Sequence, residues 1–257
     1  MELFDTWGVW ALLAGAAFAA GVLNAIAGGG SFLTFPALVF AGLPPMVANA
    51  TSAVAVSPGY LGSTVGFKAE LAALPQQRIK DETLVAAVGG VIGALLLLVT
   101  PAQVFQGLVP WLLLFATVLF ALGPRIAKFR ASTAVAGEAS TLKRNMGLLL
   151  VAIYGGYFNG GLGILLLALY TVCGEKQLST ANALKNLNSL VLSLLSVATF
   201  AVAGAIAWGP ALVMMVAATF GGYAGARGSK KVSVAWVRGV VMVTGLVMSL
   251  IFFIRGA

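Results

Sequence analysis

The sequence predicts an all-α polytopic membrane protein made of two inverted-topology repeats, and three observations lead to this prediction. Hydrophobic residues make up 60% of the 257 positions and charged residues only 9%, with a mean hydropathy of +1.03. Apolar blocks long enough to cross a bilayer follow one another with short interruptions, and the spacing of the first half recurs in the second. This composition leaves almost no residues for a soluble domain, so the bilayer is the expected solvent.

The apolar blocks set the expected helices, because a membrane-spanning helix needs about 20 mostly apolar residues. The blocks lie at 7–42, 46–67, 82–100, 103–123, 145–173, 179–203, 208–226 and 233–254. Before the first block stand Glu2 and Asp5 but no Lys or Arg, which is the wrong charge for a cleavable signal peptide. We therefore expect this segment to remain in the mature protein.

An internal duplication relates the two halves. Gly21-Val-Leu-Asn24 followed by Gly28 matches Gly156-Tyr-Phe-Asn159 followed by Gly163, a shift of 135 residues. Shifts of 133 and then 132 match the Ala-Asn-Ala motifs at 48–50 and 181–183, and the Gly-Gly-x-x-Gly motifs at 89–93 and 221–225. Because the matches stay in order, the sequence predicts a first repeat at 1–123, a basic linker at 124–144 and a second repeat at 145–257.

The distribution of basic residues predicts that the second repeat is inverted, since Lys and Arg in short loops stay on the cytoplasmic side. Basic residues occupy the loops 68–82, 124–144, 174–178 and 226–232, and are absent from 41–45, 101–102 and 204–208. The loop after the second block is basic in the first half and uncharged in the second, and the loop after the third block shows the reverse. We expect the basic loops on the cytoplasmic side of the membrane and both termini on the outer side; Arg255 is the exception.

Opposite orientation requires an odd number of crossings per half, so one of the four blocks in each half enters and leaves by the same face. The first block is the candidate, because glycines interrupt it at 28–30 in one half and at 160, 161 and 163 in the other. Each half is thus expected to hold a glycine-broken hairpin, either re-entrant or crossing twice, followed by three transmembrane helices.

Paired helix breaks at corresponding positions of inverted repeats are typical of a substrate site. Helices that begin after the breaks, near Ser31 and Ile164, would present free N–H groups and a positive dipole end, which favours an anion. Asn24 and Asn159 are expected one turn before the breaks, where each caps exposed backbone or contacts substrate. The alternative is that the glycines only allow close helix packing. We favour that reading for the Gly-Gly-x-x-Gly motifs, which we interpret as lacking polar neighbours.

The second block of each half carries further polar residues: Asn49, Thr51 and Ser52 in the first, and Asn182, Lys185, Asn186, Asn188 and Ser189 in the second. A lysine at the bilayer centre costs about 2.5–3.5 kcal/mol on insertion scales, which a functional role would justify. Alternatively, Lys185 snorkels back to the basic side. Arg238 is interpreted as a snorkelling anchor.

What the sequence lacks narrows the function. It has no histidine and a single cysteine, Cys173, so no metal site and no cofactor are expected. The acidic residues lie in loops or at block edges: Glu2, Asp5, Glu70, Asp81, Glu82, Glu138 and Glu175. We therefore expect neither a proton relay through the membrane nor an enzyme. The net charge of +8 reflects positive-inside topology rather than nucleic-acid binding.

The run Gly21-Val-Leu-Asn-Ala-Ile-Ala-Gly-Gly-Gly-Ser-Phe-Leu-Thr-Phe-Pro36, with Ala48-Asn-Ala-Thr-Ser52 and Gly155-Gly-Tyr-Phe-Asn-Gly-Gly-Leu-Gly163, resembles the TauE/SafE family of sulfite exporters and related anion permeases. The resemblance covers essentially the whole chain. It implies a permease of a bacterial-type plasma (inner) membrane for sulfite, sulfonates or other small sulfur-containing or organic anions. The residues it implies along the path are Asn24, Gly28, Gly29, Gly30, Ser31, Asn49, Thr51, Ser52, Asn159, Gly160, Gly161, Gly163, Asn182, Lys185 and Asn186.

The sequence thus predicts a secondary transporter that moves a small anion by alternating access at a midplane site between the repeats. The alternatives are a passive anion channel and a membrane-embedded accessory subunit without transport activity. The expected partners are the anionic substrate and the lipid bilayer. The sequence does not identify a coupling ion, H⁺ or Na⁺.

Overall fold

The computed structural model describes residues 7–26, 29–132, 140–228 and 234–254, and every regular element among them is a helix. The helices are α1 (Trp7–Ile26), α2 (Ser31–Phe40), α3 (Pro45–Gly66), α4 (Lys68–Ala72), α5 (Gln76–Val99), α6 (Ala102–Ser132), α7 (Thr141–Tyr157), α8 (Leu162–Val172), α9 (Leu178–Val202), α10 (Trp208–Gly228) and α11 (Val234–Ile254). Among the described residues, four helices contain stretches long and apolar enough to cross a membrane: Trp7–Asn24, Gln76–Val99, Ala102–Leu122 and Leu178–Val202. The chain is therefore an all-α, multi-pass membrane protein, as predicted.

The predicted interruption of the first block is confirmed in both halves. α1 ends at Ile26 and α2 begins at Ser31, while α7 ends at Tyr157 and α8 begins at Leu162. Gly29 and Gly161 have φ angles of 91° and 77°, which favour glycine over any residue with a Cβ. α2 and α8 have 10 and 11 residues, so each is about 15–17 Å long, roughly half the thickness of the hydrocarbon core.

Two segments differ from the expected loops. α5 begins at Gln76, directly after Pro75, so the polar residues 76–81 form its first turns instead of a connection. α6 continues to Ser132, well into the segment expected as a linker, because residues 125–131 are mostly good helix formers.

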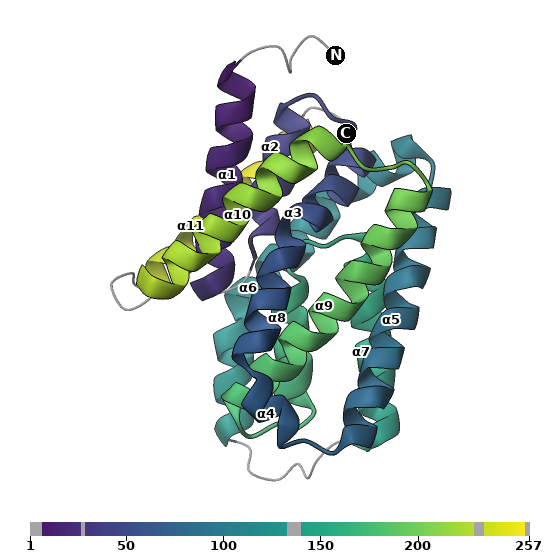
Figure 1. The fold of residues 1–257 in the computed structure, drawn as a ribbon, viewed down its shortest axis with the longest axis vertical. Helices are drawn as coiled ribbons and strands as arrows, with labels where there is room; N and C mark the ends of the chain where they lie inside the picture. Colours follow the sequence, from purple (N-terminus) through teal and green to yellow (C-terminus); the bar gives the residue numbers. More distant parts are fainter. Residues whose placement is uncertain (1–6, 27–28, 133–139, 229–233, 255–257) are drawn as a thin grey trace.

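Each broken helix packs against a helix from the other half of the chain (Figure 1). α1 lies along α10, and α7 lies along α5, while α3 and α9 contact each other in the middle of the bundle. The backbones approach closely at glycines: a Cβ on Gly21 would overlap the backbone of Ala218 and Gly222, and one on Gly156 would overlap that of Gly90. The packing role proposed for the Gly-Gly-x-x-Gly motifs is therefore confirmed.

Figure 1 shows that α1 begins at the same end of the molecule as the α2–α3 and α9–α10 turns, whereas α4 and the first turns of α5 and α7 lie at the opposite end. Near the first end the core is rich in phenylalanine. Phe35 of α2 contacts Phe158 edge-on, with 5.5 Å between ring centroids, and stacks on Phe252 at 6.0 Å. This end is therefore filled by closely packed side chains.

Candidate functional site

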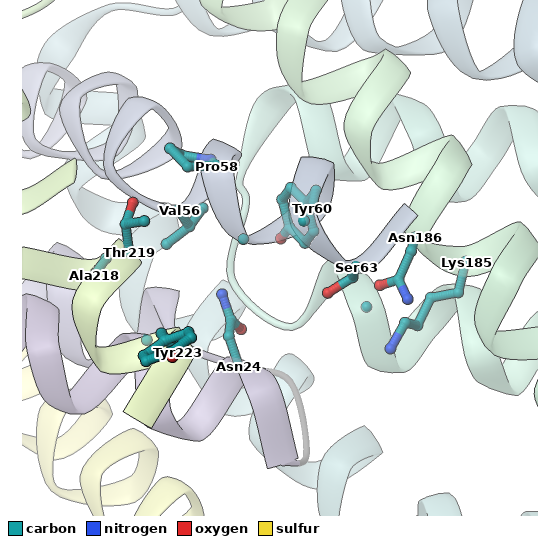
Figure 2. Close-up of a pocket in the computed structure, with 16 residues that line it drawn as sticks. Asn24, Val56, Pro58, Tyr60, Ser63, Lys185, Asn186, Ala218, Thr219 and Tyr223 are labelled. Carbon is teal, nitrogen blue, oxygen red and sulfur yellow. The ribbon is translucent and has the colours of Figure 1, made fainter. Parts of the chain in front are cut away.

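A cavity of about 430 Å³ lies between α1, α3, α8, α9 and α10 (Figure 2). Its wall is formed by Gly21, Asn24, Gly29, Val56, Pro58, Gly59, Tyr60, Gly62, Ser63, Gly163, Lys185, Asn186, Ala218, Thr219, Gly222 and Tyr223. The volume and the mixture of apolar and polar residues are those of a small-molecule site.

Of the residues predicted to line the path, the structure places Asn24, Gly29, Gly163, Lys185 and Asn186 at this cavity. The two glycine breaks and the polar face of α9 thus meet around one space, although they are far apart in the sequence. Gly28 lies outside the described residues. The other predicted residues lie away from the cavity wall.

Asn24, in the last turn of α1, bridges the first break and the cavity. Its side-chain oxygen accepts a 2.8 Å hydrogen bond from the N–H of Gly30. Its amide nitrogen has no hydrogen-bond partner among the described residues and points into the cavity (Figure 2). Asn24 therefore caps backbone and also presents a donor to a ligand.

The helix starts after the breaks offer fewer free N–H groups than expected. The N–H of Gly30 is bonded to Asn24, and the N–H groups of Phe32 and Leu33 donate to the carbonyls of Gly29 and Gly30 at 3.0 Å. At the second break, Ile164 donates to the carbonyl of Gly161 at 3.0 Å. Local bonds thus satisfy these donors, and neither Gly30 nor Ser31 is among the residues that line the cavity.

Asn159 is not the geometric counterpart of Asn24, and its predicted place one turn before a break was wrong. α7 ends at Tyr157 because Phe158 is extended, with φ −144° and ψ 111°, so Asn159 lies within the break. It is buried and accepts a 3.4 Å hydrogen bond from the hydroxyl of Tyr60. Nearby, the carbonyl of Gly160 accepts from the hydroxyl of Tyr154 at 2.9 Å.

The predicted polar residues of α3 join helices and lie outside the cavity wall. Asn49 donates to the carbonyl of Tyr157 at 3.0 Å, at the end of α7. The hydroxyl of Thr51 accepts from the N–H of Ala207 at 3.1 Å, in the α9–α10 turn. Ser52 bonds Thr34 of α2 at 2.6 Å. All three are buried, so their side chains hold α3 against three other segments.

Lys185 and Asn186 stand in the second and third turns of α9 and line the cavity. Figure 2 shows the Lys185 side chain extending from α9 toward the middle of the cavity, past the start of α8. Neither side chain has a hydrogen-bond or ion-pair partner among the described residues, and no acidic residue lines the cavity. Asn182 instead donates to the carbonyl of Leu178 at 2.9 Å, one turn back on its own helix.

Sequence reasoning missed four polar residues of the wall: Tyr60, Ser63, Thr219 and Tyr223. They belong to the second halves of α3 and α10. A local signal could have found Thr219 and Tyr223: Tyr223 directly follows Gly222, and Thr219 lies about one turn before Gly222. The interpretation of that glycine motif as lacking polar neighbours was therefore wrong.

A second missed feature is a buried charge cluster around Glu82, in the second turn of α5. Glu82 is fully buried, and its carboxylate lies 2.9 Å from the Nε atoms of both Arg78 and Arg144. It also accepts from the hydroxyl of Tyr170 at 2.7 Å, and Asn188 donates to that hydroxyl at 2.6 Å. Buried charges need such partners. The cluster joins α5, α7, α8 and α9, so Glu82, at the edge of its apolar block in the sequence, is buried between four helices.

Broken helices around a polar cavity in an all-α membrane protein are typical of membrane transporters, and comparison with known proteins agrees. The chain matches the model of the family described as "Sulfite exporter TauE/SafE" over residues 13–252. The chain belongs to this TauE/SafE family.

Relatives of the chain carry transporter names. It is 29% identical over 248 residues to "Probable membrane transporter protein YfcA" of Escherichia coli K12, covering 91% of this chain and 85% of that protein. It is 29% identical over 216 residues to "Probable membrane transporter protein ORF9" of Sinorhizobium sp., covering 82% and 80%. A "Probable membrane transporter protein" of Haemophilus influenzae is 28% identical over 243 residues, covering 90% and 89%. No solved structure matches the chain significantly.

Proposed function

We propose that this protein is a secondary transporter of a small anion, either sulfite, an organosulfonate or a related sulfur-containing or organic anion, and not an enzyme. One observation carries the proposal: both glycine breaks contribute to a cavity whose described lining residues include a lysine and no carboxylate. A lysine in a membrane-spanning helix favours an anionic ligand as its counter-charge. The transporter names of the relatives support the same class of function.

We further propose that residues 1–123 and 145–257 are inverted repeats joined by a linker at 124–144. The reciprocal packing supports this, because α1 packs on α10 as α7 packs on α5, and α2 meets α11 as α8 meets α6. The short α2 and α8 support re-entrant hairpins, since neither helix is long enough to cross the hydrocarbon core.

The position of the cavity suggests which side of the membrane it faces. Its wall uses the second halves of α3 and α10 and the early turns of α9, all of which lead to the basic loops. If those loops are cytoplasmic, with both termini outside, the conformation is open toward the cytoplasm. The phenylalanine-rich packing at the other end closes the outer side. Transport then requires the opposite arrangement to form in turn.

Purified protein reconstituted in liposomes tests the proposal. Under an imposed gradient, we expect saturable uptake of sulfite or of a small sulfonate, dependent on the protein. A current in planar bilayers far above the turnover of a carrier would instead identify a passive anion channel. A protein that moves none of these anions would contradict transport and favour an accessory subunit. Parallel runs with a Na⁺ or a proton gradient would identify the coupling ion.

A further inference from the structure

The two ends of the cavity differ in chemistry. Figure 2 shows Lys185, Asn186 and Ser63 together on one side of the view, and Val56 and Ala218 with their neighbours on the other. The amide of Asn24 lies between the two groups. A ligand that fills the cavity therefore meets mainly polar groups at one end, and at the other mainly carbon together with the hydroxyl-bearing Thr219 and Tyr223.

The polar end of the cavity carries hydrogen-bond donors that have no side-chain partner among the described residues. The Lys185 ammonium and the Asn186 and Ser63 side chains have no side-chain hydrogen-bond partner among the described residues, and the amide nitrogen of Asn24 is also unpaired. An ammonium is a donor only, and amide and hydroxyl groups can donate as well. Oxyanions offer only acceptors, so they complement this end. Among the described residues of the wall, Lys185 is the positive charge and none is a carboxylate, which matches a single negative charge on the ligand.

The opposite end offers little to a hydrated ion. Val56 is buried and apolar, and Pro58 and Ala218 add further carbon surface. The hydroxyl of Thr219 already donates to the carbonyl of Met215 at 2.8 Å. A cavity of 430 Å³ corresponds to roughly fourteen water molecules at about 30 Å³ each. A lone inorganic oxyanion would fill only a small part of it, whereas an alkyl group would bury apolar surface against this wall.

We propose that the substrate is an organic monoanion, with an oxyanion head bound at Lys185 and a short apolar tail directed toward Val56 and Ala218. This inference rests on the proposed transport function and narrows its substrate class. An amino group on the tail is disfavoured, because the described part of the wall already carries a positive charge and offers no carboxylate to pair with a second cation.

Binding of a sulfonate series to the full-length protein in lipid nanodiscs tests this by titration calorimetry. Methanesulfonate, ethanesulfonate and propane-1-sulfonate share the head and the charge and differ only in tail length. We expect affinity to rise about fourfold for each added methylene, the factor that burial of one CH₂ group corresponds to. Propane-1-sulfonate should also bind more tightly than sulfite. Taurine, which has an ammonium where propane-1-sulfonate has a methyl group, should bind at least tenfold more weakly than that sulfonate.

Substitutions in the apolar wall test where the tail of the ligand binds. Val56→Thr keeps the shape of the side chain and places a hydroxyl at the apolar end, so the roughly sixteenfold preference for propane-1-sulfonate over methanesulfonate should fall to fourfold or less. Val54→Thr is the matched control, since Val54 is buried on the same helix outside the cavity wall and should keep the full preference. If Val56→Thr does not fold, Ala218→Ser serves the same purpose.

The outcomes separate this inference from the proposed function. If sulfite and methanesulfonate bind but affinity does not rise with tail length, or if taurine equals propane-1-sulfonate, the tail site is wrong and the anion site stands. If Val56→Thr and Val54→Thr keep the same preference, the tail lies elsewhere and the inference is overturned. If no anion binds at all, the transport site itself is wrong.

Discussion

Two contacts between the halves of the chain correspond under the repeat alignment, and one is closed at its glycine whereas the other is open there. On α5, a Cβ at Gly90 would lie 2.8 Å from the carbonyl oxygen of Leu192, and Ser196 donates to the Gly90 carbonyl at 3.0 Å. On α10, the corresponding Gly222 has no atom of α3 within 4 Å of that position, and its nearest neighbour is the Gly21 carbonyl at 3.8 Å. The cavity extends into this space between α3 and α10.

This difference suggests how alternation would proceed. The contacts that hold α1 on α10 and α7 on α5 are close in both pairs, so these pairs are the constant parts. The contacts of α3 with α10 and of α9 with α5 are the ones that differ. A transporter built from inverted repeats would exchange them, closing one as the other opens.

The largest effect is expected on thermal stability, from a substitution at a position where corresponding residues of the two repeats differ in charge. The positions that correspond to Glu82, Tyr170 and Asn188 are Met214, Phe35 and Ala55, all buried in the apolar core. A polar cluster thus joins α5 to α7, α8 and α9, whereas apolar packing occupies the corresponding positions of α10, α2 and α3. Glu82→Gln removes the charge that both arginines face, and breaking a buried ion pair in this way costs about 3–5 kcal/mol.

We expect Glu82→Gln to lower the thermal unfolding midpoint in detergent by several degrees. The control is Glu70→Gln in the short α4, because Glu70 makes no ion pair among the described residues. Equal unfolding midpoints for the two variants would show that the Glu82 cluster does not stabilise the packing of α5 against α7, α8 and α9.

The second effect concerns the cavity lysine, whose corresponding residue is the buried Ser52. Lys185→Ala should reduce anion uptake by on the order of 10- to 100-fold, since hydrogen bonds to a charged group contribute about 1.5–3 kcal/mol. Insertion into the membrane should be unchanged, because the substitution removes a charge from a spanning helix. Lys176→Ala, on the exposed α8–α9 turn, is the control. Normal uptake by the Lys185 variant would mean that this lysine only snorkels.

The features that could be predicted from sequence are those with a local cause. The helix breaks follow from Gly29 and Gly161, whose φ angles suit glycine, and Lys185 attracted notice as a lone charge in an apolar block. The roles of Asn49 and Thr51 had no such signal, because their partners Tyr157 and Ala207 lie 108 and 156 residues away.

The cavity wall was predicted in part for the same reason. Its residues from α1, α8 and α9 lie beside the glycine breaks or carry a charge, whereas Tyr60 and Thr219 come from helices whose proximity depends on tertiary packing. Glu82 shows the same limit: near the end of an apolar block it resembles a loop residue, and only Arg144 and Tyr170, brought from α7 and α8, reveal that it is buried.

The smallest expected effect is on the balance between two conformations, and it tests whether the α5–α9 and α3–α10 contacts exchange. Gly90→Ala places a methyl group against the Leu192 backbone, and overpacking of this kind typically costs about 1–3 kcal/mol. The cost falls on the conformation described here, so the population should shift toward the one in which α9 leaves α5. Gly222→Ala meets open space here and should shift the population the other way if α3 closes onto α10.

Accessibility of the cavity measures that shift. In a Cys173→Ser background, Ser63→Cys places one thiol in the cavity wall for labelling by a membrane-impermeant maleimide applied to inside-out vesicles. Gly90→Ala should slow the labelling several-fold and Gly222→Ala should leave it equal or faster. The same response from both variants would mean that the two contacts do not exchange, because opposite responses follow only if closing one requires opening the other.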